Sequence, residues 1–400
     1  MRKLSLFTVG MVLLLFKGWA QSSDSYKNQK LKVDDVNIVS GYYTQTGNHS
    51  AVTGGIGTQK LSDISNSIDL RLVKSGEFNR KYHLDIGVGI DHHSAASSAN
   101  VSKTGASRTG GTRLYPSVNW QVDNEDRHTS FGVGASYSHE YTYQSFGLNA
   151  MFSKKSTNEN TEFTAKANLF IDQVRMVEPS ELRPAETVVT SASGTARGNS
   201  IPTSPRNSFD LSLSLSQVVN KRMQVAFLTD AVAQQGYLGL PYYRVYFNDG
   251  TVHIENLPGS RLKLPLGVRM NYFLGDRFIV KAYYRYFMDN WGVKSHTISL
   301  ETPVKITPFV SVSPFYRFYI QTAANFFAPY GQHTASERYY SSDYDYSAFS
   351  SNYEGVNLRL GPTNGLLGMK GFSAVEFRFG HYLQTTGLVA NSLSMNLTFK

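Results

Sequence analysis

Apolar and polar residues alternate along most of the chain from residue 30 onward. Residues 82–90 give a clear example, in which polar residues or glycine separate an apolar row: Tyr82, Leu84, Ile86, Val88 and Ile90. Because successive side chains of a strand point to opposite faces, this period of two predicts strands with one apolar and one polar face. Such segments, about ten residues long and separated by turn residues, are typical of membrane barrels.

The alternation predicts an all-β fold: a single antiparallel transmembrane barrel of about 16 strands, within a range of about 14 to 18. The expected strands are residues 36–45, 62–74, 80–91, 112–123, 128–140, 143–155, 160–173, 208–219, 222–234, 262–274, 277–289, 291–302, 307–320, 354–361, 372–384 and 389–400. With the C-terminus in the periplasm, the long connections all fall on the outer side, at 92–111, 174–207, 235–261 and 321–353. Short polar turns fall on the periplasmic side, as expected for this class.

The N-terminus has the features of a secretory signal peptide. Arg2 and Lys3 precede an apolar stretch over residues 4–16, and the small residues Gly18 and Ala20 come before a cleavage position. We expect residues 1–20 to be a signal peptide, 21–35 a short periplasmic segment and 36–400 the barrel. The expected location is the outer membrane of a Gram-negative cell.

Composition excludes several classes of protein. The chain contains no cysteine, which excludes disulfides, thiolate metal sites and a lipid-modified cysteine. Removing Arg2, Lys3 and Lys17 with the signal lowers the formal net charge from +9 to +6. The bases are scattered along the strands, whereas a nucleic-acid interface gathers them on one face. We expect membrane lipid, the barrel-assembly machinery and an envelope protein as partners, and no nucleic acid.

The last predicted strand carries the most specific feature of the sequence. Polar residues separate its apolar row, which ends one residue before the C-terminal Lys400: Leu393, Met395, Leu397 and Phe399. This row resembles the terminal signal by which outer-membrane barrels are recognised for assembly.

Four long stretches resemble the domain of unknown function 3570 family: VDDVNIVSGYYTQTGNHSAVTGGIGTQKL, YHLDIGVGIDHHSAASS, GASRTGGTRLYPSVNW and LPYYRVYFNDGTVHIENLPGSRLKLPLGVRMNYF. The resemblance covers nearly all of the mature chain. It implies an outer-membrane barrel of Gram-negative, Bacteroidetes-type bacteria and carries no assigned activity. It also implies flavin-transfer and thioredoxin-like envelope proteins as neighbours, and therefore a redox-linked system.

A barrel of about 16 strands is wide enough to leave an aqueous lumen. With the apolar rows outward, the inward positions carry more bases than acids: Asp69, Arg71, His83, Asp85, Lys166, Arg269, Lys281, Arg285, Arg317, Arg359, Glu376 and Arg378. Because rings of Arg and Lys favour anions in pores, these residues predict a lumen that prefers anions. The alternative is that the charges pair across strands and only hydrate the interior.

Two outer regions carry further candidate chemistry. A metal site could form from imidazole and carboxylate ligands, which suit zinc, copper or iron: His49, Asp91, His92 and His93. Adjacent histidines point to opposite sides of a strand, so only a loop would bring both to one ion. The alternative is that these are ordinary polar loop residues, and no other cofactor is expected.

The second outer region is rich in tyrosine, whose flat ring and polar tip suit stacking on sugars or gripping a partner. The candidate binding residues are Tyr339, Tyr340, Tyr344 and Tyr346. The alternative is a loop that packs on itself.

These features predict a passive pore or uptake channel for small, anionic solutes, with access set by the outer loops. The first alternative is a non-transporting barrel that anchors or partners other envelope components. A third possibility, a barrel hydrolase, rests on Ser94 and Ser97, which follow the Asp91–His93 stretch. No nucleophile motif supports it, so we predict no enzymatic activity.

Overall fold

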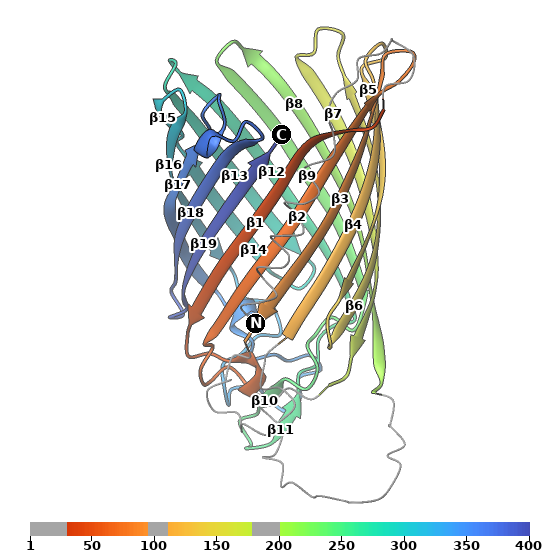
Figure 1. Ribbon diagram of the computed structural model, residues 1–400. Coiled ribbons are helices and arrows are strands. Elements are labelled where there is room, and N and C mark those ends of the chain that lie inside the picture. Colours follow the sequence, from red (N-terminus) through yellow and green to blue (C-terminus); the bar gives the residue numbers. More distant parts are fainter. Residues whose placement is uncertain (1–29, 95–110, 178–200) are drawn as a thin grey trace, which may run out of the picture.

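The computed structural model describes residues 30–94, 111–177 and 201–400, which form one closed antiparallel barrel (Figure 1). The sheet has 17 strands, but β14 (Lys294–Glu301) and β15 (Val304–Thr307) are consecutive pieces of one barrel strand. Both pieces pair with β13 on one side and with β16 on the other. The barrel therefore has 16 strand positions, as the sequence predicts.

The other barrel strands are β1 (Lys32–Thr46), β2 (Leu61–Ser75), β3 (Arg80–His93), β4 (Gly111–Asn124), β5 (Thr129–His139), β6 (Tyr143–Lys155), β7 (Thr161–Arg175), β8 (Thr203–Asn220), β9 (Met223–Gly236), β12 (Ser260–Leu274), β13 (Phe278–Asp289), β16 (Val310–Gln321), β17 (Phe349–Leu360), β18 (Phe372–Gln384) and β19 (Val389–Phe399). A separate hairpin contains β10 (Arg244–Tyr246) and β11 (Val252–Ile254). Short 3-10 turns are η2 (Ala51–Thr53), η4 (Tyr344–Tyr346) and η5 (Leu366–Gly368).

The first and last strands close the barrel. β1 pairs with the full length of β19, from Val36 opposite Phe399 to Thr46 opposite Val389. Leu393, in the middle of β19, is 51% exposed on the exterior. The terminal apolar row therefore belongs to the closing strand, and its recognition by the assembly machinery stays a prediction.

The exterior of the barrel is apolar. On β3, Ile86, Val88 and Ile90 are exposed, whereas the intervening Gly87 and Gly89 are buried. Comparable rows of exposed large apolar side chains follow the other strands. A surface of this kind suits lipid rather than water. No helix among the described residues has the length and apolar character needed to cross a membrane.

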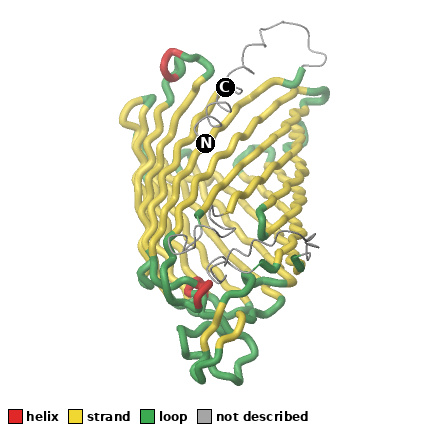
Figure 2. The backbone as a smooth tube through the Cα atoms, turned by 60° about the horizontal axis from the view of Figure 1, so that its bottom comes forward, coloured by secondary structure: helices red, strands yellow, loops and turns green. Residues whose placement is uncertain are grey.

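The two ends of the barrel differ. At the end that holds the C-terminus, here the inner end, tight turns join the strands, as at residues 76–79, 125–128 and 275–277. At the opposite, outer end the connections 237–259 and 322–348 are long, and the β10–β11 hairpin projects beyond the barrel (Figures 1 and 2). Most of the other two predicted long connections lies outside the described residues. The short turns predicted for the inner side are confirmed.

Several of the predicted strand boundaries are wrong, and two of them have a clear physical reason. The strand expected to end at residue 302 continues past Pro303 into β15, and the turn lies at residues 308–309. Proline has no backbone N–H and therefore resembles a strand end, but Thr302 N still donates to Pro314 O (3.0 Å) and the ladder resumes at Val304. β17 begins at Phe349 instead of 354 because its polar start lies beyond the apolar band and lacks the alternation that the prediction used.

Candidate functional site

The lumen is lined by charged side chains that remain accessible to water. The predicted lumen residues lie on the face opposite the exposed apolar rows: Asp69, Arg71, His83, Asp85, Lys166, Arg269, Lys281, Arg285, Arg317, Arg359, Glu376 and Arg378. The side chains of Arg71, Lys281 and Arg359 are 49%, 47% and 54% exposed. Because they point inward, the interior contains solvent-accessible space that the side chains of the described residues do not fill.

The inward charges are separated between two walls of the barrel. The wall of strands β12 to β18 carries mostly bases: Arg261, Lys263, Arg269, Lys281, Arg285, Arg317, Arg359 and Arg378, with Asp289, Glu301 and Glu376 as acids. The wall of strands β1 to β9 carries more acids than bases: the acids include Asp35, Asp63, Asp69, Asp85, Asp91, Asp123, Glu162, Asp172, Asp210 and Asp230, and the bases include Arg71, Lys81, Arg113, Lys155, Lys166 and Arg206. We call these two surfaces the basic wall and the acidic wall.

The sequence predicts more bases than acids at the inward positions, and the two walls show where that excess lies. The excess holds only for the basic wall. Asp91 and Asp123 face inward near the ends of β3 and β4, where Asp91 accepts a hydrogen bond from Tyr115 (2.6 Å) and Asp123 lies 3.0 Å from His83. Neither residue was predicted to line the lumen, because the alternation is weakest at strand ends.

Several arginines of the basic wall lack an acidic partner among the described residues. Lys281 and Arg378 share Glu301, each at 3.3 Å. Arg269 and Arg317 instead lie over the rings of Tyr283 and Tyr353, with the guanidinium carbon 5.8 and 4.9 Å from the ring centroids. Together with Lys281 and Arg378 they line a cavity of about 250 Å³ within the lumen. This cavity offers uncompensated positive charge beside aromatic surface.

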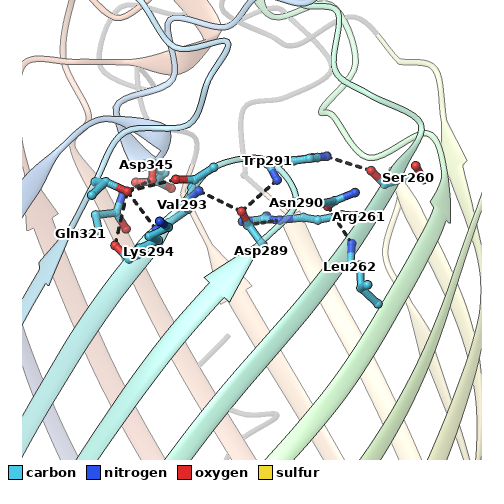
Figure 3. A network of polar contacts seen from close by, with 12 residues as sticks. Ser260, Arg261, Leu262, Asp289, Asn290, Trp291, Val293, Lys294, Gln321 and Asp345 are labelled. Atoms are coloured by element: carbon cyan, nitrogen blue, oxygen red, sulfur yellow. Dashed lines mark hydrogen bonds and ion pairs between the residues drawn. The ribbon is translucent and has the colours of Figure 1, made fainter.

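A network of hydrogen bonds fixes the outer rim of the basic wall (Figure 3). Asp289, whose side chain is fully shielded from solvent, accepts bonds from the amides of Trp291 (3.0 Å) and Val293 (2.9 Å) and from Arg261 Nε (2.8 Å). Trp291 Nε1 donates to the carbonyl of Ser260 (2.8 Å). The turn between β13 and β14 is therefore tied to the start of β12.

The long outer segments pack on this rim. Trp291 and Val293 form a buried apolar cluster with Ala324 and Phe326 of the segment 322–348. The ring of Trp291 meets Phe326 edge-on at 5.1 Å. The segment is therefore held over one side of the outer end.

The four candidate tyrosines are half-buried in the outer segments and do not form a free, exposed surface. Tyr340 packs against Phe247 (4.9 Å between ring centroids), and Tyr344 stacks on His49 (3.7 Å). Tyr339 and Tyr346 pack against the Trp291 cluster. These contacts agree with the alternative of a loop that packs on itself, and the binding role of the tyrosines stays a prediction.

A second cavity, of about 440 Å³, lies between these segments and the barrel wall. We call it the mouth cavity. Bases of the wall line one part of it: Arg206, Arg261 and Arg285. Acids of the outer segments line another part: Glu255, Asp343 and Asp345.

Glu255 is the most deeply placed acid of the mouth cavity. Burial raises its pKa to about 7, although hydrogen bonds from Ser341 and the Leu240 amide oppose the shift. Ser341 Oγ donates to Glu255 Oε1 at 2.5 Å. At neutral pH this carboxyl is therefore divided between its protonated and ionised forms.

The structure does not assemble the predicted metal site. His92 lies on the outward face of β3 and contacts Thr112, whereas Asp91 and His93 lie on the inward face. His49 contacts the carbonyl of Gly55 (2.9 Å) and stacks on Tyr344. Across residues 30–94, 111–177 and 201–400, no three His, Asp or Glu side chains are grouped so that they could hold a metal ion. His92 and His93 both belong to strand β3, so their side chains point to opposite faces.

Sequence reasoning also missed residues that define the mouth cavity. Arg206 and Arg261 were left out because the predicted strands began at 208 and 262, whereas β8 and β12 begin at Thr203 and Ser260. Extending the alternation backward by one or two residues would have placed both on the inward face. Glu255 and Asp343 lie in connections, where no periodic signal exists.

A closed antiparallel barrel with an apolar exterior and a charged interior is a transmembrane β-barrel of the outer-membrane type. The sequence profile of the family described as "Protein of unknown function (DUF3570)" matches residues 97–391. The chain belongs to this family.

Comparison with solved structures finds porins. A BenF-like porin from Pseudomonas fluorescens Pf-5 is 8% identical, with 92% of this chain and 98% of that chain covered and a TM-score of 0.43. Pseudomonas aeruginosa OccK9 (OpdG) is 8% identical, with the same coverage and a TM-score of 0.44. No curated protein matches the chain in sequence.

Proposed function

We propose that the barrel is an outer-membrane pore for small solutes that carry an anionic group. The observation that supports the proposal best is the set of inward-facing, water-accessible bases on the basic wall. Arg285 and Arg317 belong to this set, and neither forms an ion pair among the residues described. Positive charge that lines a pore favours anions.

The two cavities lie in sequence along the basic wall. Arg285 lines the mouth cavity, and Arg317 lines the lumen cavity. Arg285 is opposite Thr297 and Arg317 is opposite Ser299, so the two arginines lie one inward-facing position apart along β14. An anionic group can therefore pass from one guanidinium to the next without leaving the wall.

Planar-bilayer recording of the purified, refolded barrel tests this proposal. We expect discrete conductance steps in KCl and, under a salt gradient, a reversal potential that indicates anion preference. The double variant Arg285→Glu, Arg317→Glu should shift the reversal potential toward cations, and more strongly at low salt because screening is weaker there.

The matched control is Lys221→Glu with Arg222→Glu, which makes the same change of charge in the exposed turn between β8 and β9. This control should keep the reversal potential close to that of the wild type. A folded barrel without conductance would refute the pore and favour the alternative of a non-transporting envelope anchor. Equal shifts in both double variants would refute the role of the basic wall.

A further inference from the structure

The mouth cavity holds opposite charges that do not neutralise each other. Arg285 of β13 and Asp345 of η4 both line it. Arg261 pairs with Asp289, but no ion pair in the described parts of the chain joins a base of the wall to Glu255, Asp343 or Asp345. A cavity of about 440 Å³ therefore presents a cationic and an anionic surface to whatever enters it.

The surrounding frame holds both charges in place. Arg285 lies within the barrel ladder, opposite Gly267 on one side and Thr297 on the other. The carbonyl of Asp345 accepts a bond from Gln321 Nε2 (2.9 Å), and its amide donates to Asp343 Oδ1 (3.0 Å). Figure 3 shows Asp345 near one end of the rim network and Arg261 toward the other end, beside Ser260.

The acids of the mouth cavity do not contribute equally to its negative charge. Burial, together with the nearby Asp345 carboxylate, raises the pKa of Asp343 to about 8. Asp343 is therefore mainly protonated at neutral pH. Burial also raises the pKa of Asp345. Asp345 is nevertheless the more exposed of the two carboxyls, so it is the one that carries the negative charge of the pair toward a ligand.

We propose that the mouth cavity binds small zwitterions, namely free amino acids or dipeptides, with the carboxylate on Arg285 and the ammonium on Asp345. A solute with one charge would leave the opposite charge of the cavity without a partner, and an unpaired, partly desolvated charge is costly. Arginine binds carboxylates through two parallel donors. The cavity volume lies in the range of about 300–1,000 Å³ that is usual for small-molecule sites.

This inference rests on the proposed pore function and names its class of solute. It is tested by ligand-observed NMR on the full-length barrel, refolded in detergent micelles, with three probes of nearly equal shape. Glycylglycine carries both charges, N-acetylglycine lacks only the ammonium, and glycine N-methylamide lacks only the carboxylate. We expect glycylglycine to bind about tenfold more tightly than either single-charge probe, since each of those probes lacks one charge-assisted hydrogen bond.

Two variants test which residue binds the carboxylate of the ligand and which binds its ammonium group. Arg285→Gln should lower the affinity for glycylglycine about tenfold and leave that for glycine N-methylamide unchanged. Asp345→Asn should also lower the affinity for glycylglycine about tenfold, and it should leave the affinity for N-acetylglycine unchanged. Lys166→Gln is the control, because it removes an inward base of the acidic wall outside the cavity.

Equal affinities for the three probes would overturn the inference, as would unchanged glycylglycine binding in both variants. Circular dichroism and unfolding on heating show whether each variant is folded. Conductance without selective binding of glycylglycine would support the pore and refute the zwitterion site. Selective binding of glycylglycine without conductance would refute the pore and support the zwitterion site.

Discussion

At the scale of single residues, the acids of the outer end have different roles. Asp289 is fully shielded, and its bonds from Arg261 and two backbone amides fix the rim. Such charge-assisted bonds are about twice as strong as neutral ones. Because Arg261 is occupied in this way, the neighbouring Arg285 is the base available to a solute.

Glu255 gives the outer segments a stability that depends on pH. Its pKa is raised to about 7 in the folded state, so the folded state binds its proton more tightly than the unfolded segment. Stability is therefore full below about pH 4.5 and falls as the pH rises through about 7, by up to about 3 kcal/mol. Protection factors for amide exchange in segments 237–259 and 322–348, corrected for intrinsic rates, should decrease between pH 5 and 8.

Glu255→Gln is the matched variant, since it keeps the shape of the side chain and removes the titration. Its protection factors should decrease less than those of the wild type over this range, and the decrease that remains comes from Asp343, whose pKa is also raised. A decrease of equal size in both proteins would assign the effect to another group.

The inward position of Arg285 or Arg317 could be predicted from the sequence because it depends only on alternation within one strand. The pairing of Arg261 with Asp289 could not, because it requires the register between β12 and β13 at a separation of 28 residues. The burial of Glu255 depends on Ser341, 86 residues away. Contacts of this range leave no periodic trace in the sequence.

At the scale of elements, the turn between β13 and β14 supports the outer segment 322–348. Trp291 contacts Val293 and Phe326 in the buried cluster, and its ring lies under the Arg261 guanidinium, 4.3 Å from the ring centroid. Trp291→Ala should lower the local stability of this segment by about 3–5 kcal/mol. Hydrogen exchange of residues 322–348 should become faster, while exchange of β1 to β9 should change little.

Trp120→Ala provides the comparison, because Trp120 is exposed on the exterior of β4. It removes the same side chain without touching the outer segment, so exchange there should stay as in the wild type. If Trp291→Ala also left this exchange unaltered, the cluster would not hold the segment.

The strands themselves could be predicted well because each crosses a medium that requires an apolar and a polar face. Prediction failed where that requirement ends. Pro303 lies near the inner end, and the polar residues that begin β17 lie near the outer end. Beyond the apolar band, hydrogen bonding continues a strand without leaving a pattern in hydrophobicity.

At the scale of the whole molecule, stability in lipid depends on which face of a strand carries a charge. Val118 and Ser117 are neighbours in the middle of β4, with Val118 exposed outward and Ser117 on the inward face. Val118→Arg should lower the free energy of unfolding in lipid vesicles by about 2–4 kcal/mol. Urea titration measures this loss.

Ser117→Arg introduces the same charge one residue away, near Asp69 on the acidic wall. This variant should remain within about 1 kcal/mol of the wild type, since lumen positions tolerate charge. Comparable losses in the two variants would mean that these faces are not lipid and lumen.

The pairing of β1 with β19 also determines when the barrel can close during its biogenesis. The two strands that seal the wall come from opposite ends of the chain, with Val36 opposite Phe399. No intermediate that lacks the last residues can become an edgeless cylinder, and open strand edges invite association with other chains. The polypeptide must therefore be synthesised completely before insertion can finish. Until then, the unpaired strands of one chain must be kept from pairing with strands of other copies of the protein.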